Sequence, residues 1–204
     1  MTDASIWIGL IGVVLVLASC DSAPPADPNL TVCQQATYDD WETSDYVLPY
    51  PAGRSYLVLQ GNCGGFSHTQ HSRIAFAYDF RMPIGEVLVA ARGGTVLEVE
   101  ESFEDFDNVR GHENGVVIDH GDGTIGVYLH VTQDGAIVEV GDRVVQGDTI
   151  GYSGHTGFST EPHLHFDVRR GCDPEYNCDS VPVTFRNTQR NPRGLGQGGV
   201  YRAL

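Results

Sequence analysis

The sequence predicts an all-β domain built on an antiparallel β-sheet core with glycine-rich hairpins. Short runs of apolar and β-branched residues recur along the chain, and 25 glycines punctuate them as turn signals. No long stretch of the central part repeats apolar residues at helical spacing. With 204 residues, the chain is long enough for one such domain and its flanking segments.

The first residues predict an export signal. From Ile6 to Ala18 the chain is an unbroken run of apolar residues and glycine, which is short for a membrane span and typical of a signal-peptide core. Leu17-Ala18-Ser19-Cys20 follows and resembles the lipobox of bacterial lipoproteins. This likeness implies a signal peptide over residues 1–19 and a lipid on Cys20. The alternative is an uncleaved N-terminal anchor, and the absence of Lys or Arg before Ile6 departs from the usual signal pattern.

Three further segments follow the signal. Residues 20–45 begin with a polar, proline-rich stretch and are expected to form a flexible tether. Residues 46–190 hold the predicted domain, and the glycine-rich residues 191–204 are expected to form a loosely ordered tail. Within the domain the residues 102–113 are acidic and polar and predict an exposed loop. The predicted strands are 56–60, 74–80, 87–91, 95–100, 116–119, 125–131, 137–140, 164–169 and 181–185.

Residues 141–151 form a strand–turn–strand phrase that is also found in lipoyl and biotinyl carrier domains. Those carriers attach their cofactor to a lysine. All twelve basic residues of this chain are arginines, so a carrier function is excluded.

The cysteines predict disulfides in an exported protein. Without Cys20, four cysteines remain, an even number that suits an oxidising compartment and permits three pairings. In one of these pairings Cys172 and Cys178 would close a short loop, and Cys33 and Cys63 would then tie the N-terminal segment to the domain; the sequence leaves the pairing open. No pair has the C-x-x-C spacing of a zinc or redox motif.

The net charge of −15 argues against nucleic acid as a partner, because binding to phosphates needs clustered positive charge.

His163-Leu164-His165 is the most informative stretch of the chain. Successive side chains of a strand point to opposite faces, so the two histidines would stand on the same face about 7 Å apart. This pairing suits one imidazole that binds a metal and a neighbour that acts on a metal-bound water. Asp167 shares that face, either as a partner of a ligand histidine or as a surface carboxylate.

Several phrases together resemble the lysostaphin-like, or LytM-type, zinc metalloendopeptidases. They cover most of residues 46–186 and occur in the family's order. The phrases are Phe66-Ser67-His68, Ala77-Tyr78-Asp79-Phe80-Arg81, Ala90-Ala91-Arg92-Gly93-Gly94, Tyr128-Leu129-His130, the turn at 141–151, and Ser153-Gly154-His155-Thr156-Gly157 leading to Pro162-His163-Leu164-His165-Phe166.

The resemblance implies the family's all-β, duplicated-hybrid-motif-like fold and a catalytic Zn²⁺ with three protein ligands. Asp79 and His165 match two ligand positions directly. The first ligand is either His68 or His71, and the likeness to a branch with a longer insertion favours His68. His130 and His163 match the family's two further catalytic histidines, which would orient or deprotonate the water and stabilise the oxyanion.

The expected function is therefore zinc-dependent hydrolysis of peptide cross-links or stem peptides of bacterial peptidoglycan. The protein would act in the cell envelope or periplasm, held to a membrane only by a lipid on Cys20. One alternative is a catalytically inactive LytM-type module that binds the cell wall or activates amidases. Another is a secreted peptidase that acts on glycine-rich proteins. Both the bond cleaved and the oligomeric state remain open at the level of sequence.

Overall fold

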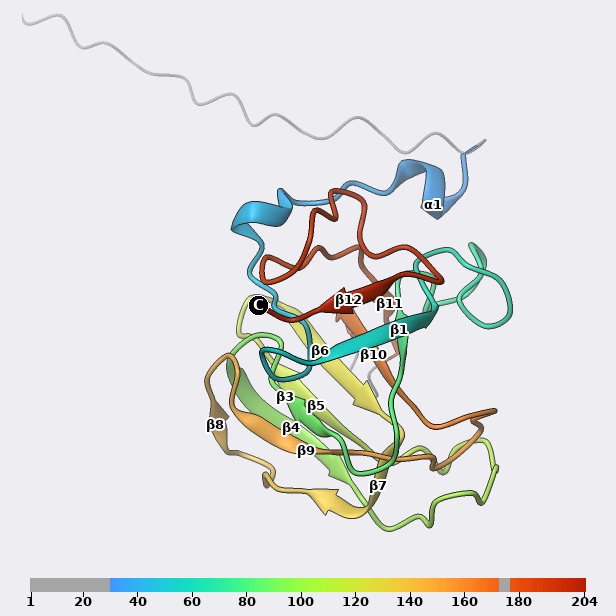
Figure 1. Cartoon of the computed structure of the whole chain (residues 1–204), viewed down its shortest axis with the longest axis vertical. Coiled ribbons are helices and arrows are strands. Elements are labelled where there is room, and N and C mark those ends of the chain that lie inside the picture. The colour runs from blue at the N-terminus through green and yellow to red at the C-terminus, as the bar shows by residue number, and fades with distance from the viewer. Residues whose placement is uncertain (1–29, 173–176) are drawn as a thin grey trace, which may run out of the picture.

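The structure, a computed structural model, describes residues 30–172 and 177–204 (Figure 1). The predicted signal peptide and Cys20 lie outside the described residues. In the described part there is one short α-helix, one 3-10 helix and twelve strands, and no helix there is long and apolar enough to cross a membrane. The elements are α1 (Val32–Gln35), η1 (Trp41–Thr43), β1 (Ser55–Gln60), β2 (Tyr78–Arg81), β3 (Val87–Val89), β4 (Gly94–Glu100), β5 (Gly115–Asp119), β6 (Thr124–Leu129), β7 (Val131–Ala136), β8 (Arg143–Val144), β9 (Thr149–Ser153), β10 (His163–Arg170), β11 (Asp179–Ser180) and β12 (Val200–Arg202).

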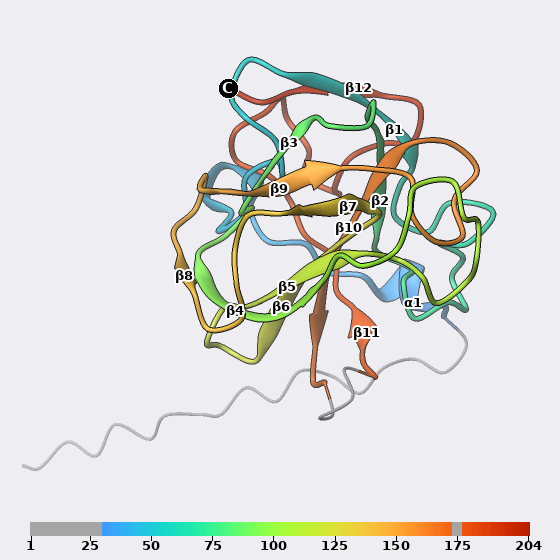
Figure 2. The ribbon, with the colours of Figure 1, turned by 90° about the horizontal axis from the view of Figure 1, so that it is seen from below.

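The strands form two antiparallel sheets, which confirms the predicted fold class. The large sheet has the order β12-β1-β2-β10-β6-β5-β4-β8, with β11 added beside β10. The small sheet has the order β3-β9-β7 and lies beside the β4–β5–β6 part of the large one (Figures 1 and 2). Strand β10 is therefore central, paired with β2 on one side and β6 on the other.

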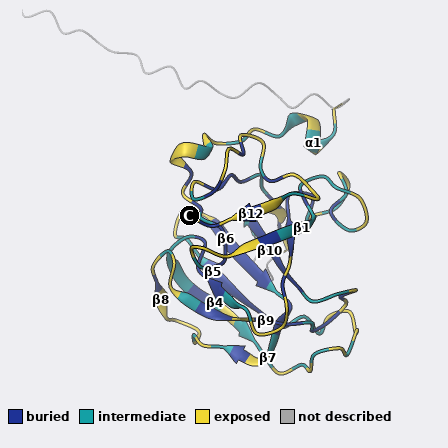
Figure 3. Ribbon diagram, viewed as in Figure 1, coloured by how far each residue is buried: buried dark blue, intermediate teal, exposed yellow. Residues whose placement is uncertain are grey.

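Strand β10 separates the hydrophobic core from a buried polar face. Its residues Leu164, Phe166 and Val168 point into the main core, where each is fully buried. The alternating residues His163, His165 and Asp167 are buried as well, but they belong to the opposite face. The dark blue of β10 in Figure 3 reflects this burial on both sides. The strand thus supplies a rigid support for polar side chains that would be costly to bury without partners.

Three predicted strands differ from the structure. The run 74–80 becomes β-structure only at Tyr78, because turns over residues 72–77 hold the first part. The run 137–140 lies just after β7, and its chain reverses where Asp142 accepts the N–H of Glu139. The run 181–185 makes one ladder bond, from Val181 to Val168, and then reaches Pro182, which has no N–H to donate.

The C-terminal tail is packed, which corrects the expectation of loose order for residues 191–204. Strand β12 pairs with β1 at the edge of the large sheet. Leu195, Tyr201 and Ala203 are buried in the core, and the Tyr201 hydroxyl accepts the N–H of Gly196. The composition suggested disorder because of its glycines, whereas Leu195 among them and Tyr201 and Ala203 after them anchor the segment.

The structure shows which of the three disulfide pairings forms. Cys33 bonds to Cys63 across 30 residues, and Cys172 bonds to Cys178 across 6. The first bond ties α1, which contains Cys33 and lies within the predicted tether, to the loop between β1 and β2. The described residues 30–45 are therefore held against the domain at one covalent point.

Candidate metal centre and active-site groove

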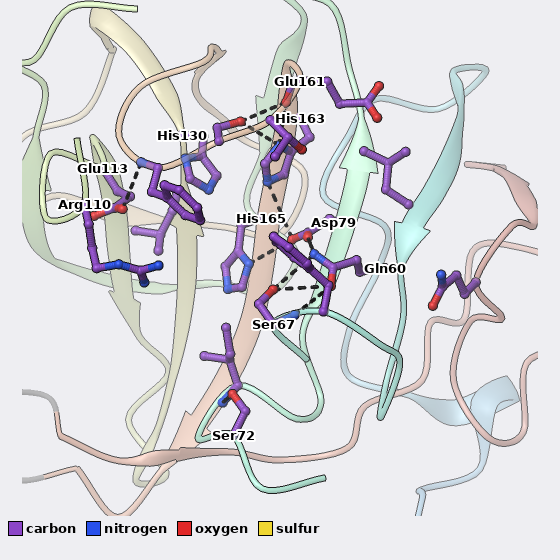
Figure 4. A pocket seen from close by; sticks show the side chains of 18 of the residues that line it. Gln60, Ser67, Ser72, Asp79, Arg110, Glu113, His130, Glu161, His163 and His165 are labelled. Atoms are coloured by element: carbon purple, nitrogen blue, oxygen red, sulfur yellow. Dashed lines mark hydrogen bonds and ion pairs between the residues drawn. The ribbon is translucent and has the colours of Figure 1, made fainter. Parts of the chain in front are cut away.

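The pairing of β2 with β10 brings Asp79 and His165 together. These residues are directly opposite one another in the antiparallel register, so their side chains share a face. His165 Nδ1 lies 2.9 Å from Asp79 Oδ1, and both side chains are buried. Figure 4 shows this pair at the centre of the site.

His68 reaches the same point from the loop between β1 and β2. It is fully buried, and its Nε2 lies 3.4 Å from Asp79 Oδ1. Neither ring nitrogen has a well-oriented hydrogen-bond partner in the described chain. His71 is exposed on the same loop, and its ring nitrogen contacts Gln70. The structure therefore brings His68, and not His71, to Asp79 and His165.

Two more histidines flank this cluster. His163 Nε2 is 3.7 Å from Asp79 Oδ1, and the rings of His130 and His163 are 4.4 Å apart between centroids. His130 Nδ1 is 2.7 Å from the carbonyl oxygen of Thr156, and His163 Nδ1 is 2.7 Å from that of Glu161. Because carbonyl oxygens only accept, Nδ1 of each ring donates and Nε2 is left as the available nitrogen.

The backbone of His130 is in an uncommon conformation. This residue links β6 to β7 with φ at 66°, in the left-handed region that non-glycine residues rarely occupy. Such strain tends to gather at functional sites, where the surrounding structure enforces it. Here the bond to Thr156 and the contact with His163 hold the ring in place.

Gln60 joins Asp79 to the loop that carries His68. Its side-chain amide donates to Asp79 Oδ2 at 2.5 Å, and its carbonyl oxygen accepts the N–H of Ser67 at 3.1 Å. Ser67 precedes His68, so one side chain sets the positions of two members of the cluster. Sequence reasoning missed Gln60, although it stands at the end of a predicted strand.

Asp167 holds the other side of His165. Its Oδ2 lies 2.9 Å from His165 Nε2, and Arg169 donates to both of its oxygens at 2.8 and 3.1 Å. Asp167 is completely buried, so it is a partner of His165 and not a surface carboxylate. The series His165, Asp167 and Arg169 alternates along one face of β10.

The electrostatics of the cluster favour a cation between the carboxylates. Burial lowers the pKa of His165, but hydrogen bonds to Asp167 and Asp79 outweigh it and raise that pKa to about 9. Burial raises the pKa of Asp79, yet the imidazoles of His165 and His68 hold it well below its usual range. Asp167 is also buried, and the charge of Arg169 together with His165 brings its pKa down to about 2. Without a metal, protonated His165 is the cation between the carboxylates of Asp79 and Asp167.

The pKa values of the flanking histidines shift in the opposite direction to that of His165. Burial and the neighbouring His163 lower the pKa of His130 to about 3. Burial also lowers the pKa of His163, against the attraction of Asp79. Both rings are therefore neutral at neutral pH and able to accept a proton at Nε2.

The residues of the cluster fit a metal ion. One ligand atom from each of His68, Asp79 and His165 lies within 4.8 Å of the others. Two imidazole nitrogens and one carboxylate oxygen are the donors that a catalytic zinc site uses, with one position left open. Such an ion would give a partner to one of the two unpartnered ring nitrogens of the buried His68.

The cluster lies at the bottom of a groove with a volume of about 780 Å³. One wall comes from the loops 101–114 and 154–162, and the other comes from the loop between β1 and β2 with part of the C-terminal tail (Figures 1 and 4). Arg110, Phe158, Phe66 and Gln197 line it, and sequence reasoning assigned a role to none of these side chains. Their loops carry no periodic signal that would have placed them here.

An antiparallel β domain with a His–Asp–His cluster in an open groove has the features of a metal-dependent hydrolase. The chain belongs to peptidase family M23, whose sequence profile matches residues 73–178. The match includes Asp79, His130, His163 and His165 and begins after His68. The LytM/lysostaphin-type family inferred from sequence is thereby confirmed.

Curated relatives carry the same domain in longer proteins. The chain is 37% identical over 93 residues to the peptidoglycan DD-endopeptidase ShyA of Vibrio cholerae, which covers 44% of this chain and 19% of that protein. It is 31% identical over 137 residues to lysostaphin of Staphylococcus simulans, which covers 67% of this chain and 24% of that protein. The chain thus spans less than a quarter of the length of these two relatives.

A solved structure shares the fold. The catalytic domain of the prophage-encoded M23 protein EnpA from Enterococcus faecalis matches with a TM-score of 0.50 at 24% identity. The match covers 65% of this chain and 93% of that one.

Proposed function

We propose that this protein is a zinc-dependent endopeptidase that hydrolyses peptide cross-links or stem peptides of bacterial peptidoglycan. The observation that carries the proposal is the convergence of His68, Asp79 and His165 from three separate segments onto one point in a groove. We assign these three residues as the zinc ligands. Family membership and the peptidoglycan endopeptidases among the relatives support the substrate class.

His130 and His163 are the residues that we assign to proton transfer. When bound, zinc would polarise the scissile carbonyl and lower the pKa of water toward about 7. His130 is neutral and presents Nε2 to the groove, so it can take the proton of the attacking water. His163 lies 4.4 Å away between ring centroids and also presents an unprotonated Nε2, so it would donate toward the oxyanion or the leaving amine only after it has taken up a proton there.

The complete set of site residues supports hydrolysis over the non-catalytic alternative. A module that only bound the cell wall would have no need for the left-handed backbone of His130 or for two neutral histidines beside the cluster. We therefore assign the chain to the hydrolytic members of the family.

The proposal extends to the location of the enzyme. We propose that residues 1–19 are a signal peptide and that a lipid on Cys20 holds the protein in the cell envelope. Two disulfides in the described chain support an oxidising compartment outside the cytoplasm. Residues 46–190 would form the peptidase domain, completed by the packed tail.

Metal content and turnover, measured together, test the assignment. We would purify the full chain and three variants, His68→Ala, His165→Ala and His71→Ala, and measure bound zinc and the release of peptidoglycan fragments. His68→Ala and His165→Ala are expected to lose at least tenfold in zinc affinity and to lose turnover, because each removes one of three ligands. His71→Ala is the matched control from the same loop and should retain both.

His130→Asn separates metal binding from catalysis in the same experiment. Asparagine tolerates the left-handed backbone, so the fold and the zinc content should persist. Turnover should fall by about 10² to 10⁴, the usual contribution of a positioned acid–base group. Full turnover in His165→Ala, or zinc loss in His71→Ala alone, would contradict the ligand assignment.

A further inference from the structure

Arg110 stands in the groove wall on a platform formed by Phe158. It belongs to the loop between β4 and β5, whereas Phe158 belongs to the loop that leads into β10, and both residues line the groove. The guanidinium carbon lies 4.5 Å from the centroid of the Phe158 ring. Such stacking covers one face of the guanidinium and leaves its in-plane N–H groups free to donate.

Arg110 differs from the other arginines near the groove because it has no carboxylate partner in the described part of the chain. Of the arginines at or beside the groove, Arg81 is paired with Glu161 at 2.7 Å and Arg169 with Asp167 at 2.8 Å. In the described part of the chain, no carboxylate lies within ion-pair distance of Arg110. A free cation in the groove is notable in a chain of net charge −15, because most of its surface repels anions.

Glu113 and Glu161 are the glutamates of the same wall, and Glu161 is paired with Arg81. The oxygens of Glu113 have other partners. One oxygen accepts the N–H of Gly111 at 2.9 Å, and the other accepts that of Phe158 at 3.2 Å. Glu113 therefore fixes the Phe158 platform instead of binding the Arg110 head. In Figure 4 both residues lie on the His130 side of the groove, and the Arg110 side chain extends toward the histidines.

The facing wall is neutral. Its lining side chains include the exposed ring of Phe66 together with Ser67, Gln60 and Gln197. These groups can contact a peptide backbone but offer no charge to a ligand. Arg169 also lines the groove but is paired with Asp167, so the unpaired positive charge lies on the wall with Arg110 and distinguishes it from the facing wall.

We propose that Arg110, supported by Phe158, binds a free carboxylate of the peptide substrate on the His130 side of the metal centre. A planar guanidinium recognises a carboxylate by two parallel hydrogen bonds, which selects an anionic peptide over its neutral amide. This inference rests on the proposed endopeptidase function, since it assigns the charge of the substrate to one wall of that site.

Matched peptides test the inference. We would compare kcat/KM for four versions of one cleavable peptide: with a Glu or Gln side chain beside the scissile bond, each with a free or an amidated carboxyl terminus. The native enzyme should prefer one carboxylate by about tenfold over its amide, as expected for a partly exposed charged hydrogen bond. Whichever amidation removes the preference identifies the side chain or the terminus as its source.

Variants assign the preference to Arg110. Arg110→Gln should lower kcat/KM on the anionic peptide to the level of the neutral one. Arg110→Lys and Phe158→Leu should lose part of the preference, because the first loses the planar fork and the second loses the ring. Arg202→Gln on β12, outside the groove lining, is the matched control and should keep it.

Other results overturn the inference in distinguishable ways. No preference in the native enzyme, or an unchanged preference in Arg110→Gln, rules out the carboxylate site even though hydrolysis is intact. If no peptide and no peptidoglycan is cleaved, the proposed function fails instead. Calorimetric binding of the same peptides to the zinc-loaded protein then tests the carboxylate site at Arg110 independently of hydrolysis. Equal affinities for the acid and the amide would contradict the site.

Discussion

His165 is held between two carboxylates, and this arrangement defines the chemistry of the cluster. Asp79 contacts Nδ1 on the groove side, and Asp167 contacts Nε2 on the side of Arg169. A carboxylate behind a ligand histidine fixes the ring and increases its basicity, and loss of such a partner typically costs 10-fold to 100-fold in metal affinity. In the proposed zinc site, Asp167 would therefore be a positioning residue for His165.

The raised pKa of His165 predicts a pH dependence of stability in the metal-free protein. The folded state binds a proton on His165 up to a pKa of about 9, against an ordinary value of 6.5, so its stabilisation is complete below pH 6.5 and is lost as the pH rises toward 9. His130 and His163 have lowered pKa values, so they are neutral in the folded state across this window. In the unfolded state they lose their protons as the pH rises above 6.5, which opposes part of the fall near the lower end of the window. We expect the Tm of zinc-stripped protein to fall by several degrees between pH 6.5 and 9.

Asp167→Asn provides the comparison for this stability experiment. The amide removes a major cause of the raised pKa, so the fall in Tm over the same pH window should become smaller. The Tm of zinc-loaded native protein should not show this fall, because metal binding requires a neutral imidazole. A steeper fall in the variant than in the native protein would contradict the proposed arrangement.

At the scale of the elements, the acidic loop between β4 and β5 holds the loop before β10 in place through hydrogen bonds, and we call this set of bonds the clamp. Asp105, Asp107 and Glu113 each accept one backbone N–H from residues 155, 157 and 158, respectively. The clamped segment contains Thr156, whose carbonyl oxygen holds His130. The sequence predicted this loop from its acidity, but only the contacts show that the carboxylates organise the groove wall.

Loss of one clamp bond should reduce turnover without reducing metal content. We expect Asp105→Asn to lower kcat/KM by about tenfold, because a small shift of Thr156 would move His130 and misplacement of a reacting group is costly. Asp148→Asn is the matched control, since Asp148 also accepts a loop N–H, that of Val145, and does not line the groove. Equal turnover in the two variants would show that the clamp has no catalytic role.

The strands were predictable in proportion to the strength of their local pattern. Short runs of β-type residues between glycine turns indicated β1, β4, β5, β6 and β10 to within a few residues, because these runs supply side chains to a common core. Strand β12 was missed because its pattern is only three residues long and its stability comes from pairing with β1. The effect of Pro182 was visible in the sequence, and it overrides the apolar run around it.

At the scale of the whole molecule, the Cys33–Cys63 disulfide joins the N-terminal segment to the loop that carries His68. Its loop of 30 residues is much longer than the 6 residues closed by Cys172 and Cys178. Chain entropy therefore predicts about 3 to 4 kcal/mol of stabilisation for the first bond and about 2 kcal/mol for the second.

Removing each disulfide in turn should reveal this order and a link to the metal. The pair of changes Cys33→Ser and Cys63→Ser should lower the free energy of unfolding more than Cys172→Ser with Cys178→Ser, as measured by denaturant titration. The first pair should also speed zinc release to a chelator, because Cys63 lies in the loop of His68. Equal rates of zinc release in the two double variants would separate the disulfide from the metal centre.

The sequence by itself indicated the fold class and the family, and it predicted disulfides and the site residues Asp79, His130, His163 and His165, because short strand patterns and ordered motifs are local properties. It left three disulfide pairings open, and the tertiary structure shows which one forms. Only the tertiary structure decided between His68 and His71, buried Asp167 beside His165, packed the tail and placed Arg110 on Phe158. The reason is that these contacts join segments far apart in the chain or depend on irregular loops, where no periodic spacing records which side chains will meet.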